Sequence, residues 1–279
     1  MQTILLTGSG GFVGKNLKAH LTAQGYNVIA PRSAEFDFTD ASAVLTLAKQ
    51  TKPDIYVLCG FYGIDNPPAV PPDTIEKNLK IFNNFIAAAN GARIITFGSG
   101  AEFDKSRHIV KAKEIDLGKT IPQDTYGQAK YLISKEIEKY DNVINLRLFG
   151  VYGPHEMQHR FITYAIKQNL KKEAININQN VVFDYLYIED LCNIVEAFIK
   201  RAPQNRFINM TPTDSIDLVQ ISQIINSSSA FKSPVNIVKQ GLNNEYTGDN
   251  AVLRAELPNF KFTSYQEGIK KFYEYLKTH

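Results

Sequence analysis

The stretch that decides the fold is Met1–Gly14, which reads MQTILLTGSGGFVG. Within it, Thr3 to Thr7 are apolar and β-branched, as in a buried strand. Four glycines crowd the seven positions that follow, and an apolar pattern of helical period begins at Phe12. The order strand, glycine turn, helix predicts a unit whose turn can bind phosphate at the start of the helix.

Three glycines of this turn have distinct roles in a dinucleotide site. Gly8 permits the tight turn, Gly11 lets the backbone approach a pyrophosphate, and Gly14 lets the helix pack closely on the strand. The pyrophosphate would lie on the free N–H groups at the start of the helix, which Phe12 and Val13 begin. We therefore predict that these five residues bind a dinucleotide. The alternative is a glycine-rich loop that binds nothing.

Length, charge and cysteine content fit one α/β domain with an added lobe. The chain has 279 residues and a formal charge of +3, and it has no run near ~18 apolar residues, so no membrane span is expected. The charge is small and the lysines are scattered, so no nucleic-acid partner is expected. Nothing near Met1 marks a signal peptide. Cys59 and Cys192 lie in apolar segments, which indicates reduced thiols, no disulfide, no metal site and a cytoplasmic location.

The second predicted strand, Asn27–Ala30, bears on the choice between NAD and NADP. Sites for NAD usually place an acidic residue about 20 residues after the glycines, where it holds the ribose hydroxyls. Here the strand runs into Pro31, Arg32 and Ser33 instead. An arginine offers a fixed fork of donors to a 2′-phosphate. The sequence therefore favours NADP held by Arg32, and it is also compatible with NAD. The alternative for Arg32 is a solvated surface charge.

Strands and helices alternate along the rest of the chain. Periodicity and capping residues predict strands at Glu35–Asp40, Ile55–Gly60 and Ala92–Gly98, and helices at Ala41–Gln50, Thr74–Asn90, Thr125–Tyr140, Asp214–Asn226 and Ser264–Leu276. Asp40 is the expected N-cap of the first of these helices, and Asp214 or Ser215 caps the fourth. The alternation predicts an α/β fold, a Rossmann-type doubly wound parallel sheet with a smaller C-terminal substrate lobe.

Ser99, Tyr126 and Lys130 form the predicted catalytic set. Tyr126 and Lys130 are four residues apart in a predicted helix, so their side chains share one face. A tyrosine hydroxyl has a pKa near ~10, and an ammonium group one turn away lowers that pKa, so that the tyrosine can exchange a proton at neutral pH. Ser99 follows a central strand at the carboxyl edge of the sheet, where its hydroxyl can hold the same substrate oxygen. Lys130 can also bind the nicotinamide ribose.

With these motifs together, the sequence resembles the extended short-chain dehydrogenase/reductase family over nearly its whole length. The resemblance rests on the spacing GxxGxxG, on YGQAK at 126–130, on NLRLFGVYGP at 145–154 and on FDYLYIEDL at 183–191. It implies further cofactor contacts. Asp37 and Phe38 would meet the adenine, Gly60 would lie over the cofactor, and Leu148 and Val151 would surround the nicotinamide.

The resemblance also divides the chain into a core and a lobe. The dinucleotide-binding core is expected at residues 1–154, with 183–201 returning to it, and the substrate-binding lobe mainly at 155–182 and 202–279. Most members of this branch act on nucleotide-activated sugars. Ser99, Glu102 and Arg160 are then the expected substrate contacts, and Arg160 could pair with a diphosphate.

Departures from the family pattern reduce the number of candidate reactions. Dehydratases carry an Asp-Glu pair directly after the hydroxyl residue of the strand end, and enzymes that resemble GDP-fucose synthase carry a Cys two residues after it. This chain has Gly100 and Ala101 there. The leading hypothesis is NADPH-dependent reduction of a nucleotide-linked 4-keto-6-deoxy sugar. The alternatives are an NAD-dependent nucleotide-sugar 4-epimerase and a non-catalytic module that senses NADP(H). Relatives pair the helices at 74–90 and 125–140 across a dimer, so a homodimer is expected.

Overall fold

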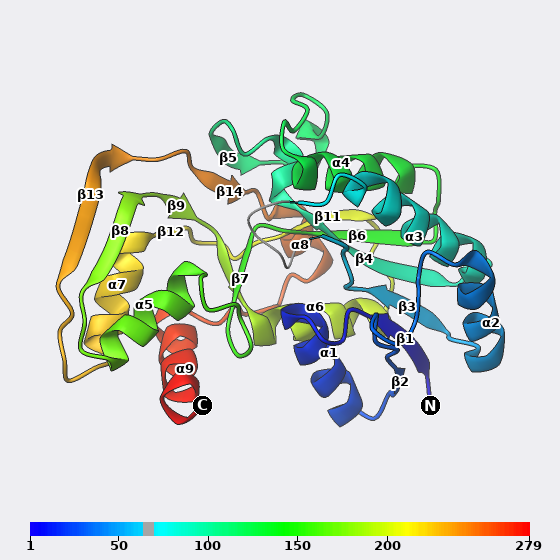
Figure 1. Ribbon diagram of the computed structural model, residues 1–279, viewed down its shortest axis with the longest axis horizontal. Helices are drawn as coiled ribbons and strands as arrows, with labels where there is room; N and C mark the ends of the chain where they lie inside the picture. The colour runs from blue at the N-terminus through cyan, green and yellow to red at the C-terminus, as the bar shows by residue number, and fades with distance from the viewer. Residues whose placement is uncertain (64–69) are drawn as a thin grey trace.

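The computed structural model describes residues 1–63 and 70–279. Its centre is a six-stranded parallel sheet with the strand order β11-β6-β4-β3-β1-β2 (Figure 1). The strands are β1 (Thr3–Thr7), β2 (Asn27–Ile29), β3 (Ile55–Leu58), β4 (Arg93–Ser99), β6 (Val143–Leu148) and β11 (Phe207–Met210). Parallel neighbours need crossover connections, and helices supply most of them. This is the α/β, Rossmann-type sheet that the sequence predicts.

Helices cover both faces of this sheet. They are α1 (Phe12–Ala23), α2 (Ala41–Thr51), α3 (Thr74–Ala89), α4 (Thr125–Ile137) and α6 (Ile188–Lys200). Side chains of a strand alternate between the two faces. In β1, Ile4 and Leu6 accordingly pack in one buried cluster with Leu17 of α1, while Leu5 packs in a second cluster with Phe85 of α3. Both faces of the sheet are therefore buried, and ligands can approach it only at its edges.

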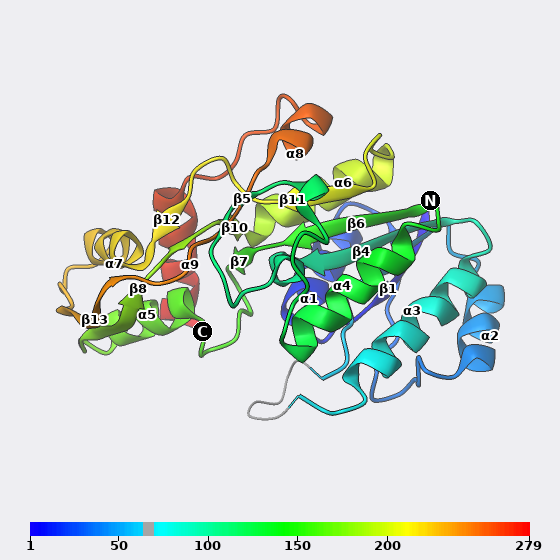
Figure 2. The same cartoon turned by 90° about the horizontal axis from the view of Figure 1, so that it is seen from above.

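The smaller lobe forms one end of the molecule, at the left of Figure 1. Three helices pack together there, next to a parallel pair of strands. They are α5 (Phe161–Leu170), α7 (Leu218–Ser227), α9 (Tyr265–Thr278), β8 (Ile175–Asn180) and β13 (Val235–Leu242). Figure 2 shows these lobe helices at the opposite end from α2 and α3. Within the described part of the chain, no helix is both long enough and apolar enough to cross a membrane.

Short strands connect the core to the lobe. One pair joins β7 (Gly150–Tyr152) to β10 (Tyr185–Tyr187), and a small sheet has the order β12-β9-β14-β5. Its strands are β5 (Ile109–Ala112), β9 (Val182–Phe183), β12 (Ile216–Asp217) and β14 (Tyr246–Gly248). The remaining elements are α8 (Ala251–Glu256) and the 3-10 helices η1 (Gly100–Phe103) and η2 (Glu114–Asp116). Through this small sheet, β14 and β5 lie next to η1, which directly follows the end of β4.

The predicted strand at Glu35–Asp40 is wrong, because these residues form turns. The Asp37 carboxylate accepts hydrogen bonds from the N–H and the hydroxyl of Thr39, both at 2.8 Å. This local bonding competes with a strand ladder. Phe38 still packs on Phe85, with ring centroids 5.5 Å apart. The predicted cap is confirmed, since Asp40 accepts from the N–H groups at the start of α2.

One helix predicted in the C-terminal part starts later than expected. The helix predicted at Asp214–Asn226 begins at Leu218, because Asp217 accepts from the N–H of Gln220 and forms the cap. Within residues 202–279, which are expected mainly in the lobe, Phe207–Met210 form β11, an edge strand of the core sheet. The reason is direct pairing with β6 over four residues.

Candidate active site

A cleft of about 1380 Å³ lies at the carboxyl edge of the core sheet and reaches the lobe. All of the residues predicted to bind the cofactor line it, and these are Gly8, Gly11, Phe12, Val13, Gly14, Arg32, Asp37, Phe38, Gly60, Lys130, Leu148 and Val151. Ser99, Tyr126 and Arg160 line it as well. Open α/β sheets bind ligands at this edge, so one cleft can hold both cofactor and substrate.

The glycine turn is packed so tightly that side chains are excluded from it. Gly8 has φ +69°, and a Cβ on it would lie 2.5 Å from the backbone N of Gly60. A Cβ on Gly14 would lie 2.2 Å from the carbonyl oxygen of Gly8. A Cβ on Gly11 would meet only that same oxygen, at 3.4 Å. Gly8 and Gly14 therefore set the turn itself, while the space beside Gly11 is left for a ligand.

The start of α1 fits the pyrophosphate of a dinucleotide. Its N-cap residue is Gly11, no side chain caps the helix, and its first turn holds no acidic residue. The first amide groups of α1 thus present a positive dipole end at the cleft wall. Arg32 lies farther along the cleft and is exposed, and its side chain makes no hydrogen bond or ion pair within the described residues. The donor set suits NAD(P), whose bound nicotinamide supplies or accepts hydride.

Tyr126 and Lys130 reach the cleft from α4, and Ser99 reaches it from the end of β4. Asp124 caps α4 by accepting from the N–H of Gly127 at 3.0 Å. A Cβ on Gly127 would lie 2.9 Å from the carbonyl oxygen of Ala101, so glycine lets α4 approach η1 closely. This close approach brings the tyrosine to the serine, as the motif spacing predicts.

Lys130 is held by groups that the sequence analysis did not identify. Its Nζ donates to the carbonyl oxygen of Phe97 at 2.7 Å and lies 4.4 Å from the ring centroid of Phe61. Burial lowers the Lys130 pKa to about 8. Phe61 also packs edge-on against Tyr126, with ring centroids 5.2 Å apart. Phe61 follows a predicted strand end, which was the only signal that could have placed it here.

The expectation that Lys130 lowers the pKa of Tyr126 differs from what the structure shows. Burial raises the pKa of Tyr126, and the Ser99 side chain opposes that rise to a smaller extent. Lys130 instead gives its hydrogen bond to Phe97. Tyr126 therefore holds its proton at neutral pH, which is the state that a proton donor needs.

Glu102 was predicted to contact substrate, and this prediction is wrong. Its side chain is fully buried and does not line the cleft. The carboxylate accepts from the Ser99 N–H at 2.8 Å, from the Ser134 hydroxyl at 2.6 Å and from Nε of Arg147 at 2.7 Å. Arg147 is fully buried too. Glu102 therefore anchors the Ser99 backbone from beneath the site.

The lobe side of the cleft is rich in aromatic rings and holds one buried acid. Phe183, Tyr185 and Tyr246 line it beside Arg160. Glu156 lines it as well, and burial raises its pKa to about 7, while the Thr163 hydroxyl donates to it at 2.6 Å. Tyr185, Tyr246 and Glu156 are not among the predicted site residues. Tyr185 lies in the motif at 183–191 but has no predicted role, and only the fold brings Tyr246 and Glu156 to the cleft.

A glycine turn on a doubly wound sheet, with serine, tyrosine and lysine at its carboxyl edge, defines a nicotinamide-dependent enzyme of the short-chain dehydrogenase/reductase type. The chain belongs to the NAD dependent epimerase/dehydratase family, whose model matches residues 4–210. It is an NAD(P)-dependent enzyme of the extended type within that class, and members of this group modify nucleotide sugars.

Named relatives illustrate this range. GDP-L-colitose synthase of Yersinia pseudotuberculosis is 25% identical over 82% of both chains. A GDP-D-glycero-L-gluco-heptose synthase of Campylobacter jejuni, crystallised with NADPH, has a TM-score of 0.85 at 18% identity and covers 100% of this chain and 98% of its own. The Bordetella bronchiseptica enzyme WbmG, in complex with NAD and UDP, has a TM-score of 0.85 at 19% identity, with 99% and 94% covered. The two structures support the fold.

Proposed function

We propose that this protein reduces the 4-keto group of a nucleotide-linked 4-keto-6-deoxy sugar with NADPH. The observation that carries the proposal is the meeting of Ser99, Tyr126 and Lys130 in the cleft that contains the glycine turn. Gly100 and Ala101 follow Ser99, so the acid and base that dehydration would need are missing from these positions. A hydroxyl, a proton donor and a lysine suffice for reduction of a ketone.

In this mechanism, NADPH held by the glycine turn and Lys130 would supply hydride for the keto carbon, C4 of the sugar. The Ser99 hydroxyl donates a hydrogen bond to the carbonyl oxygen and orients it. As negative charge develops on that oxygen, Tyr126 transfers its phenolic proton to it, and the product is an alcohol. Lys130 binds the cofactor ribose and compensates the charge left on the tyrosine.

Arg32 supports NADPH over NADH as the reductant. It lines the cleft directly before the turns at residues 33–40, and no acidic residue occupies the tip of β2. A free guanidinium can bind a 2′-phosphate in two-pronged fashion. Arg160 is the candidate contact for the diphosphate of the nucleotide sugar, because it lies on the lobe side of the same cleft.

Turnover of defined keto sugars tests this proposal. NADPH oxidation is followed with 4-keto-6-deoxy sugars linked to GDP, CDP, dTDP and UDP, each made in place by its dehydratase. GDP substrates come first because two of the named relatives carry GDP in their names. We expect oxidation with one nucleotide. Tight cofactor binding without oxidation across the panel would refute the reductase and point to an epimerase with retained NAD.

A further inference from the structure

Tyr246 is a tyrosine at the reactive end of the cleft that the proposed reaction does not use. It lies on β14 and lines the cleft together with Ser99 and Tyr126. A Cβ on Gly100 would lie 2.7 Å from the Tyr246 hydroxyl oxygen, so this hydroxyl is at the peptide next to Ser99. The Ser99 side chain lowers the pKa of both tyrosines, against the rise that burial causes. Ser99 is therefore flanked by two phenols, one from α4 and one from β14.

The position of the Tyr246 ring is fixed by aromatic packing. The ring lies 5.3 Å from that of Phe149 and 5.7 Å from that of Phe183, measured between centroids. Phe149 in turn stacks on Phe103 of η1, with centroids 6.1 Å apart. A tyrosine that only fills space between apolar rings could be a phenylalanine. A hydroxyl has a use when a polar group lies near it. The Tyr246 hydroxyl lies beside the Gly100 peptide, and the Ser99 side chain is a polar group that lowers its pKa.

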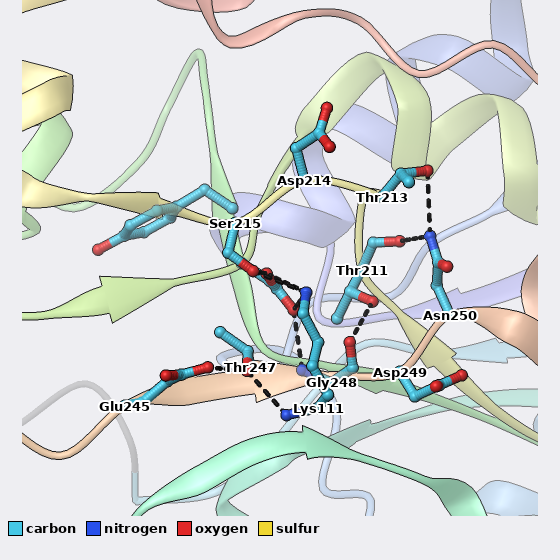
Figure 3. Close-up of polar contacts among 12 residues, drawn as sticks. Lys111, Thr211, Thr213, Asp214, Ser215, Glu245, Thr247, Gly248, Asp249 and Asn250 are labelled. Atoms are coloured by element: carbon cyan, nitrogen blue, oxygen red, sulfur yellow. Dashed lines mark hydrogen bonds and ion pairs between the residues drawn. The ribbon is translucent and has the colours of Figure 1, made fainter.

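The backbone on either side of Tyr246 is held by the polar cluster in Figure 3. The N–H of Lys111 donates to the Thr247 hydroxyl at 2.9 Å, and the N–H of Gly248 donates to the Asp184 carboxylate at 2.8 Å. Lys111 also extends its Nζ to Asp184 at 3.3 Å and to the Ser215 hydroxyl at 2.6 Å. Because Asp184 is fully buried, this pairing ties β5, β14 and the loop before β12 to one point.

We propose that Tyr246 is a positioning residue whose O–H donates to Ser99 and thereby directs the Ser99 proton to the carbonyl oxygen of the substrate. This inference rests on the proposed reduction. A serine hydroxyl has one donor and two acceptor positions. The N–H of Ala101 already donates to Ser99 Oγ at 3.1 Å. A second donor, Tyr246, fills the remaining acceptor position, so the proton of Ser99 is left for the substrate oxygen or, before substrate binds, for Tyr126.

The kinetic test uses Tyr246→Phe, which keeps the ring and removes the hydroxyl. We expect kcat to fall about tenfold, the effect of one neutral hydrogen bond, with KM and cofactor affinity unchanged. The matched control is Tyr164→Phe, the same change in the lobe but outside the cleft, which should leave kcat unaltered. In a double-mutant cycle, Ser99→Ala with Tyr246→Phe should equal Ser99→Ala within about twofold. The inference would be overturned if the loss of kcat in the double variant were the product of the two single losses. It would also be overturned if Tyr246→Phe left kcat unchanged.

A readout without substrate separates this inference from the proposed function. Tyrosines labelled with ¹³C at Cζ are observed by NMR in the cofactor-bound protein, and Tyr126 is assigned with Tyr126→Phe. In Tyr246→Phe, the Tyr126 signal should shift and its ionisation should move up in pH, because the Ser99 proton is no longer directed to it. The charged groups near Tyr126, which are Glu102, Arg160, Asp124, Lys105 and Lys130, are the same in both proteins.

The two readouts have distinct outcomes. A Tyr126 signal that is unchanged in Tyr246→Phe would refute the coupling through Ser99, even if the protein reduces keto sugars. A shifted signal in a protein that oxidises NADPH with no sugar of the panel would refute the proposed reaction, while the hydroxyl network itself would stand.

Discussion

Replacement of Glu102 by glutamine should remove the charge partner of a fully buried arginine. In the native protein, Arg147 is 0% exposed, donates to Glu102 at 2.7 Å and has Asn209 as a further acceptor at 3.3 Å. Its Nη2 atom has no hydrogen-bond partner among residues 1–63 and 70–279. Glu102→Gln preserves shape but removes the carboxylate that pairs with the guanidinium, and Glu114 remains as a nearby acidic group. The expected loss in free energy of unfolding is about 3–5 kcal/mol, a large part of the roughly 5–15 kcal/mol of a typical domain.

Urea unfolding followed by circular dichroism measures this loss, since the chain has no tryptophan to report by fluorescence. The matched control is Glu138→Gln, which breaks the pair with Lys135 on the exposed face of α4 and should leave stability nearly unchanged. The double variant Glu102→Gln, Arg147→Met removes both charges and should recover most of the loss. A glutamine oxygen can still accept from the Ser99 N–H. The activation free energy calculated from kcat per folded molecule should therefore change far less than the free energy of unfolding.

The reasoning would be refuted by a Glu102→Gln protein that unfolds within about 1 kcal/mol of the native one, a difference typical of surface changes. It would also be refuted by a double variant no more stable than Glu102→Gln. Either result would mean that groups other than Glu102 stabilise the positive charge of Arg147. The ion pair would then not be what anchors Ser99.

The remaining predictions concern the cofactor, the proton donor, a buried acid and assembly. Arg32→Ala should raise the KM for NADPH by about tenfold or more, the worth of a charge-assisted hydrogen bond, and leave the KM for NADH unchanged; equal effects on both would contradict a 2′-phosphate contact. Tyr126→Phe should bind NADPH normally but lose at least about 10²-fold in turnover, whereas a sensor would show no turnover in either protein. The raised pKa of Glu156, about 7 against an ordinary 4.5, means that the folded state keeps a proton that the unfolded state loses between pH 4.5 and 7, so stability falls as pH rises through that window. Glu156→Gln should therefore gain about 2.5 kcal/mol relative to the native protein between pH 5 and pH 8, and a constant difference would show that Glu156 is not desolvated. If α3 and α4 form a homodimer interface, Leu132→Glu on the exposed side of α4 should convert a dimer to a monomer in light scattering, and a native monomer would contradict the expectation.

The parts of the fold that follow from short-range patterns could be predicted from the sequence. The turn between β1 and α1 depends on glycines within seven positions, and the pairing of Tyr126 with Lys130 depends on one helical turn. The place of Ser99 at the carboxyl edge of the sheet depends only on the direction of the parallel strand that it ends. Each of these features is decided by backbone geometry close in sequence, so the expected residues line one cleft.

Features that depend on distant partners could not be predicted in this way. Glu102 looked like a free polar residue near Ser99, but its cation, Arg147, is 45 positions away in the sequence. Ser215, an expected cap of the helix predicted from Asp214, does not cap it. Its hydroxyl instead bonds Lys111 and Asp184, which are 104 and 31 positions away in the sequence. A local pattern carries no information about such pairs. The same limit explains why Tyr246 was missed.

The electrostatics of the free cleft favour donation of a proton over its removal. Burial raises the pKa of Tyr126, so the phenol keeps its proton, and burial lowers the pKa of Lys130 to about 8, so the ammonium is present mainly below that pH. Reduction of a ketone consumes a proton from the tyrosine, while alcohol oxidation must begin from a phenolate. At neutral pH these protonation states therefore suit the proposed reduction. As pH rises through about 8, Lys130 loses the charge that would compensate the tyrosinate formed during reduction, and kcat for reduction should fall there before Tyr126 itself ionises.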